Sequence, residues 1–126
     1  MTIRIEVDTH GFEGKASELI AQAIPAIKQE WNEPIVTIVN QSKNECPFLH
    51  GPLVESESEE WEQTETSLQV SIGYNTAYAL IQHENMDFHH LGGKKAKYLE
   101  DPIKQHVQQL QDATEQGIEK AAKVFI

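Results

Sequence analysis

The sequence predicts an α+β fold in which an antiparallel β-sheet with a β-hairpin arm packs against long N-terminal and C-terminal helices. Two patterns lead to this prediction. Apolar and polar residues alternate along 2–8 and 66–74, which is the period of a half-buried strand. Apolar residues recur at helical spacing along 12–31 and 103–125. A chain of 126 residues fits a single domain spanning 1–126, with a modest core.

The N-terminal part of the chain is predicted to run as a strand and then a helix. Residues 2–8 fit an edge strand that completes a sheet. The helix over 12–31 contains Pro25, which lacks an amide proton and crowds the carbonyl group of Ala21. We therefore expect a kink or a break at Pro25.

The stretch that follows can be interpreted in two ways. Asn32, Glu33 and Pro34 fit a helix cap followed by a first helical turn. Residues 35–39 are β-branched and favour a strand. A helical face is kept as well, by Ile35, Val39, Ser42 and Cys46. Local sequence leaves both interpretations open; our prediction is a helix to about Asn44.

Residues 53–73 are predicted to form a β-hairpin arm. Its first half is the most acidic stretch of the chain and contains no basic residue. The glutamates are Glu55, Glu57, Glu59, Glu60, Glu62 and Glu65. Because like charges oppose a compact fold, we expect a solvated, flexible arm. A calcium loop is disfavoured, since no glycine stands where such a loop turns. The strand at 66–74 is expected to pair with this stretch as the second half of the hairpin.

The next segment is predicted to contain a short helix and a short strand. Asn75 or Thr76 can cap a helix that continues through Glu84. The residues expected to face inward are Ala77, Leu80 and Ile81. After Gly92 and Gly93, residues 96–99 fit a short strand.

The chain is predicted to end in a long amphipathic helix. Asp101 and Pro102 fit its cap and its first turn. Its apolar stripe is Ile103, Val107, Leu110, Thr114, Ile118, Ala121, Ala122 and Phe125. Gly117 is expected to weaken this helix.

The charge balance narrows the choice of partners. The formal net charge is −10. Nucleic acid is therefore not expected as a tightly held ligand, because phosphate binding needs clustered basic residues. DNA could still slide past such an acidic surface. The single cysteine, Cys46, excludes an internal disulfide and fits a reducing cytoplasm. No signal peptide and no membrane span are expected.

Histidine and glutamate residues form the strongest candidate for chemistry, and they are His83, Glu84, His89 and His90. The zinc-protease motif needs a second histidine four residues after the first, where this chain has Asp87. A Gly-x-Ser-x-Gly elbow and a P-loop are also absent from the sequence. We predict no catalytic residue, no metal and no cofactor, and expect hydrogen-bonding histidines at a subunit contact. The alternative is a small cytoplasmic metal-binding protein or enzyme that uses this cluster.

Two stretches of the C-terminal half carry a resemblance to a known family. The first reads Tyr-Ala-Leu-Ile-Gln-His-Glu at 78–84 and is followed by His89, His90 and Gly92. The second reads Lys-Tyr-Leu-Glu-Asp-Pro at 97–102. Together they resemble the minor capsid or tail-completion proteins of tailed bacteriophages, which form part of the neck that joins head to tail.

An upstream step of the family pattern is also present, at Pro47, Gly51, Leu53 and Ser56. Here His50 stands where the family usually has threonine, and Pro52 follows the glycine. The turn of this loop therefore departs from the pattern. The resemblance covers roughly residues 47–124, and the N-terminal third matches only in its helical character.

The resemblance implies a structural virion protein without catalytic activity, found in the neck or tail and in the host cytoplasm during assembly. It implies a homomeric ring, a hexamer rather than a dodecamer, through which DNA passes without specific binding. The other expected partners are neighbouring neck and tail proteins (a connector or stopper, and the tail tube or sheath), with no membrane. The residues expected at the subunit contact are Tyr78, His83, Glu84, His89, His90, Phe125 and Ile126.

Overall fold

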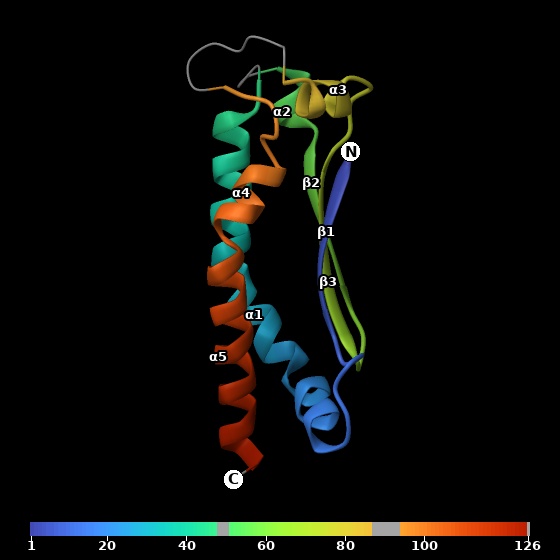
Figure 1. Ribbon diagram of the computed structural model, residues 1–126, viewed down its shortest axis with the longest axis vertical. Helices are drawn as coiled ribbons and strands as arrows, with labels where there is room; N and C mark the ends of the chain where they lie inside the picture. The colour runs from blue at the N-terminus through green and yellow to red at the C-terminus, as the bar shows by residue number, and fades with distance from the viewer. Residues whose placement is uncertain (48–50, 87–93, 126) are drawn as a thin grey trace.

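The computed structural model describes residues 1–47, 51–86 and 94–125. Along the chain the elements are β1 (Thr2–Asp8), α1 (Lys15–Glu45), α2 (Pro52–Glu55), β2 (Glu57–Gln63), β3 (Ser67–Tyr74), α3 (Ala79–Glu84), α4 (Glu100–Gln105) and α5 (Val107–Phe125). Figure 1 shows an elongated molecule with the sheet on one side and the long helices on the other. The predicted α+β fold is confirmed. Within the described residues, no helix is long and apolar enough to cross a membrane.

The sheet has three antiparallel strands in the order β1-β3-β2. Val70 of the central strand lies opposite Ile5 on one side and Trp61 on the other. The predicted pairing of the acidic stretch with 66–74 is confirmed for Glu57–Gln63. The arm predicted over 53–73 begins later, because Pro52–Glu55 forms helix α2, in which Leu53 and Val54 are buried. The hairpin supplies both the middle and one edge of the sheet. Its apolar residues Leu68 and Ile72 are fully buried, because they alternate onto the face that α1 covers.

Residues 15–45 form one continuous helix, α1, that passes through both Pro25 and Pro34. The helix expected to end near Asn44 is confirmed, whereas the separate start at Asn32 is wrong. A proline inside a helix costs roughly 3 kcal/mol. Apolar burial outweighs this cost after Pro34, since Ile35, Ile38 and Val39 are buried there. Each contributes about 1.5–3 kcal/mol. At Pro25 the helix is not broken, but Figure 1 shows its N-terminal turns leaning away from the rest.

Helix α5 packs along α1, and Gly117 lets the two backbones approach closely. A Cβ atom at Gly117 would lie 2.7 Å from Cα of Ile27 and 2.8 Å from its backbone nitrogen. Further along the pair, Nε1 of Trp31 donates a hydrogen bond to Oγ1 of Thr114 at 2.9 Å. The glycine expected to weaken the last helix is therefore a contact point between the two longest helices.

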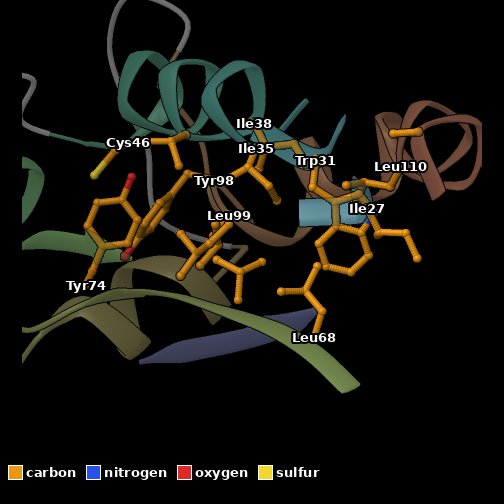
Figure 2. Packing of buried hydrophobic residues seen from close by; sticks show 14 of the residues in the cluster. Ile27, Trp31, Ile35, Ile38, Cys46, Leu68, Tyr74, Tyr98, Leu99 and Leu110 are labelled. Atoms are coloured by element: carbon orange, nitrogen blue, oxygen red, sulfur yellow. The ribbon is translucent and has the colours of Figure 1, made fainter. Parts of the chain in front are cut away.

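The core lies between α1, the sheet and the segment that leads to α4, as Figure 2 shows. Tyr98 and Leu99 of that segment are fully buried beside Ile38 of α1. Cys46 is a fully buried free cysteine at the end of α1. Burial raises the pKa of its thiol to about 12, although the nearby Lys94 lowers it slightly.

The last helix differs from the prediction at its start. It is divided at His106 into α4 and α5. Leu99 is the N-cap of α4, no side chain caps it, and Asp101 lies within the first turn. The expected cap at Asp101 is therefore wrong, because this carboxylate pairs with Lys95 instead. Val107, placed on the apolar stripe, is 41% exposed.

Candidate interaction site

The two stretches that carry the family resemblance are hydrogen-bonded to each other at one end of the molecule (Figure 1). The backbone N–H of Lys97 donates to the carbonyl oxygen of His83 at 2.7 Å. The backbone N–H of Glu100 donates to Nε2 of His83 at 3.1 Å. Residues 79–84 and 97–100 thus form one unit, which we call the His83 unit.

His83 is buried, and both of its ring nitrogens have partners. The residue is 1% exposed. Because Nε2 accepts the hydrogen bond from Glu100, the ring proton lies on Nδ1, which donates to Oε1 of Glu84 at 2.8 Å. A metal ion needs a ring nitrogen with a free lone pair. His83 has none in this arrangement, so its chemistry is that of a structural hydrogen-bonding residue.

Tyr98 joins the His83 unit to the core. Its hydroxyl group donates to the carbonyl oxygen of Ala79 at 2.8 Å. Its ring packs edge-on against His83 and against Tyr74, with ring centroids 5.1 Å apart in both pairs. The hydroxyl groups of Tyr74 and Ser42 are hydrogen-bonded at 2.7 Å. Burial raises the pKa of both tyrosines above the usual value, so both remain protonated and hold the unit to α1.

Charged side chains close the outer side of the His83 unit. Lys97 pairs with Glu84 and also, at 3.3 Å, with Glu100. Lys104 pairs with Glu100 at 3.3 Å. The hydrogen bond from Lys97, followed by the one from His83, holds the pKa of Glu84 below its usual value. These ion pairs lie near the solvent, where water and salt weaken them. They orient the unit more than they stabilise it.

The backbone at Lys97 turns sharply. Its φ angle is 57°, the left-handed conformation that residues with a Cβ atom seldom adopt. The turn is held by the bond from Lys97 to His83 and by the N–H of Asp101, which donates to the carbonyl of Lys97 at 2.9 Å. The short strand expected at 96–99 is therefore wrong, because this segment folds back onto α3 instead of extending.

Helix α3 turns its larger apolar residues outward. The expected inward positions Ala77, Leu80 and Ile81 are exposed, so this prediction is wrong. Ala79 and His83, one helical turn apart, are the buried residues. The helix docks through the hydrogen bonds of His83 and through Ala79, whose small apolar side chain is part of the core. The exposed apolar residues at this end, which we call the α3 surface, are Tyr78, Leu80, Ile81 and Met86.

The structure assigns different places to the residues predicted at a subunit contact. Tyr78 is exposed and belongs to the α3 surface, and Glu84, the last residue of α3, has a half-exposed side chain. Tyr78 is also the N-cap of α3, so the caps expected at Asn75 or Thr76 are wrong. His83 lies inside the subunit and supports the α3 surface from within.

The remaining predicted contact residues lie elsewhere along the chain. His89, His90 and Ile126 are outside the described residues. Phe125 is the last residue of α5, and Figure 1 shows this end of α5 at the opposite end of the molecule from α3.

Sequence reasoning missed most of the partners of His83. The spacing of Glu100 and Lys104, and of Lys97 and Glu100, is a local signal for ion pairs on a helix. No local signal indicates that Ser42 and Tyr74 meet behind Tyr98, because 32 positions separate them in the chain.

A metal centre does not emerge from the described residues, in which no three histidine, cysteine, aspartate or glutamate side chains are grouped to hold an ion. No protein-family model, no curated protein and no solved structure matches the chain. The resemblance to tail-completion proteins therefore rests on the motif residues themselves.

Proposed function

We propose that this chain is a structural virion protein of a tailed phage, forming a homomeric ring in the neck that joins head to tail. The observation that supports it is the His83 unit. The stretches 78–84 and 97–102, which carry the resemblance, are hydrogen-bonded to one another through His83 and Glu100. A motif that folds into one local unit with an exposed apolar surface suits assembly better than catalysis.

The ring contact that we propose is heterologous. One subunit contributes the C-terminal end of α5, and its neighbour contributes the α3 surface. These two regions lie at opposite ends of the molecule (Figure 1). A contact between unlike surfaces closes into a ring when the rotation between copies is right. The ring is a hexamer rather than a dodecamer in this proposal, and neighbouring neck and tail proteins cover its two faces.

The charge of the chain fits a passage for DNA. Each copy carries a formal net charge of −10. A ring of such copies repels DNA phosphates at short range, so DNA can move through without being held. The same charge disfavours association of free subunits, so we expect a monomer in dilute solution and a ring only where a neighbouring protein provides a template.

The experiment is carried out on the phage whose genome encodes this chain. Deleting residues 124–126 removes one half of the proposed contact, and Leu80→Asp with Ile81→Asp removes the other half. Each variant should remain a folded monomer by circular dichroism and should yield filled heads without attached tails. Val107→Asp is the matched control, because Val107 is an exposed apolar residue outside both surfaces.

Normal virions from both contact variants, with normal virions from the control, would show that the ring is not built this way. Filled heads without tails from all three variants would also count against the proposed contact. Finding the chain absent from purified particles would refute the proposed function as a whole.

A further inference from the structure

The outer edge of β2 is a free sheet edge. In an antiparallel pair, residues alternate between those that bond the partner strand and those that point away from it. The N–H of Thr64 donates to the carbonyl of Ser67 at 2.9 Å, which fixes this alternation. The backbone groups of Glu59, Trp61 and Gln63 therefore point away from β3. Within the described part of the chain, no hydrogen bond joins these groups to another segment.

A groove runs beside this edge, between β2 and α1. One hollow of about 790 Å³ lies at the end of the hairpin, and a second of about 310 Å³ lies next to it. The lining of the first is Ala21, Gln22, Ile24, Pro25, Gln63, Thr64 and Glu65. The lining of the second is Lys28, Gln29, Asn32 and Trp61. The lining residues come from α1, β2 and the turn after β2, and none comes from β3, so both hollows open on the free side of β2.

The groove has the dimensions of an added strand. The α1 residues that line it span positions 21–32, or roughly 17 Å at the rise of an α-helix. An extended segment of about five residues covers the same distance. Trp61 is half-buried on the groove face of β2, and Lys28 lies 5.8 Å from its ring centroid. An aromatic ring placed this way offers an apolar anchor to a segment laid along the edge.

The negative charge of β2 indicates which kind of segment would bind along this edge. The strand carries Glu57, Glu59, Glu60 and Glu62 and no basic residue. Lys43 is the basic partner of Glu57, at 3.7 Å, and Oε1 of Glu57 is buried without a hydrogen bond. Burial, and then the neighbouring Glu59, raises the pKa of Glu57 to about 7. The raised pKa reduces the negative charge of Glu57 near neutral pH. Among the ion pairs of the described residues, none places a cation at Glu59, Glu60 or Glu62, so the uncompensated negative charge of this edge lies on these three residues.

We propose that the free edge of β2 and the groove beside it bind an extended, lysine- or arginine-rich segment of a partner protein, which adds to the sheet as a fourth strand. Main-chain bonds to Glu59, Trp61 and Gln63 supply the affinity, as in other cases of strand addition. Basic side chains on one face of the segment lie opposite Glu60 and Glu62, at the cross-strand distance where opposite charges stabilise a pair. Apolar side chains on its other face lie beside Trp61. The inference stands independently of the proposed ring.

A second copy of the chain is the wrong partner for this edge. Among the described residues, the other edge strand of the sheet is β1, which carries Glu6 and Asp8 and one cation, Arg4. Arg4 is already paired with Glu6 at 3.4 Å. Pairing β1 with β2 would place acidic residues opposite acidic residues, which is destabilising. The acidic edge of β2 therefore repels another acidic strand and attracts a basic one.

The test uses the isolated protein and a synthetic peptide of seven residues, the length of β2, in which lysine and valine alternate. Hydrogen exchange should slow at the amides of Glu59, Trp61 and Gln63 when the peptide binds. A peptide with the same side chains but an N-methylated backbone should bind about tenfold more weakly or worse, because it cannot complete the ladder. Equal binding of the two peptides would mean that charge alone attracts them, and would overturn the proposal.

Charge reversal supplies the matched control. A triple variant should lose its affinity for the lysine peptide and should bind a peptide in which glutamate replaces lysine. Its substitutions are Glu59→Lys, Glu60→Lys and Glu62→Lys. A control variant reverses three exposed glutamates away from this edge, which are Glu13, Glu115 and Glu119. It changes the net charge equally and should keep its affinity for the lysine peptide. Equal loss in both variants would overturn the proposal.

Self-association is measured in the same protein by sedimentation velocity at rising concentration. Glu59→Pro removes an outward N–H and leaves the bonds to β3 in place, so it tests the edge alone. Oligomers that this variant abolishes would assign the edge to a second copy and not to a basic partner. Because the peptide assay needs no virion, its failure would leave the ring proposal standing, and the reverse also holds.

Discussion

Two parts of this molecule are held together by different kinds of contact. The α1–α5 pair is joined by buried apolar residues, with Gly117 set against the backbone of Ile27. The His83 unit is joined by polar groups: His83 bonds the backbone of Glu100, and Tyr98 bonds the backbone of Ala79. Apolar contact tolerates small changes in position, whereas a buried hydrogen bond needs both of its partners in place.

The difference decides what each part shows to the solvent. A helix pair that packs through its apolar stripe leaves polar residues outside. The short helix α3 docks through His83, so Leu80 and Ile81 are left exposed, each at 55%. Polar docking therefore frees neighbouring apolar residues of α3 for a partner. The helix pair leaves single apolar residues exposed instead, Val36 on α1 and Val107 on α5.

The largest effect is expected at the closest contact of the helix pair. Gly117→Leu places a side chain where the backbone of Ile27 lies, so we expect a loss of about 3 kcal/mol in unfolding free energy. Chemical denaturation measures it. Glu115→Leu is the control, because Glu115 is exposed on the same helix and should tolerate leucine. Equal stability of the two variants would mean that the helices can separate without penalty.

A slightly smaller effect is expected at the His83 unit. His83→Ala leaves the N–H of Glu100 without its partner and opens a space beside Tyr98, so a loss of about 2–3 kcal/mol is expected. Faster hydrogen exchange in α3 and α4, but not in the sheet, would show that the polar contacts of His83 hold only this part of the molecule. His10→Ala, at an exposed histidine, serves as the control. Uniform loss of protection would contradict the division into two parts.

The hydrogen bond between Trp31 and Thr114 within the helix pair should matter less. Trp31→Phe removes the hydrogen bond to Thr114 and keeps most of the buried area, so we expect a loss of about 1 kcal/mol. A double-mutant cycle with Thr114→Val isolates the bond itself. A coupling energy close to zero would show that this hydrogen bond adds nothing to the apolar contact of the helix pair.

The smallest effect is expected at Asp101. Because Asp101 does not cap α4 and its ion pair with Lys95 is partly exposed, Asp101→Ala should cost less than about 1 kcal/mol. Thermal denaturation at low and high salt measures it, and the small difference should shrink as salt rises. A loss near 2 kcal/mol that does not change with salt would indicate that the Asp101 side chain caps the helix after all.

The sequence predicts what depends on neighbours along the chain. Alternation in 2–8 and 66–74 and the helical stripe from Ile103 onward depend on residues a few positions apart, and each predicted element is present. The continuity of α1 through Pro34 depends on the whole core, so local cap signals at Asn32 misled. The hydrogen bond between His83 and Glu100 joins residues 17 positions apart, and periodicity carries no information about it.

The same limit applied to the direction in which α3 faces. In a helix of six residues, Leu80 and Ile81 are the natural choice for the buried side. In the structure the opposite face of α3 is buried, because His83 forms hydrogen bonds with the backbone. These bonds depend on the turn at Lys97, which lies outside the helix. Gly117 stands out in the sequence, but its role as a close contact between α5 and α1 depends on the position of Ile27, which is distant in the chain.

The labelling rate of Cys46 can be used to measure how often the protein unfolds around this residue. Only a thiolate attacks a disulfide reagent, and this thiol is fully buried with its pKa raised to about 12, so the native state should be almost inert. Labelling of the single thiol therefore reports how often the chain opens around it. At one pH and reagent concentration, Gly117→Leu should be labelled far faster than the unaltered protein, and Asp101→Ala at nearly the same rate. Rapid labelling of the unaltered protein would mean that the end of α1 opens locally while the rest stays folded.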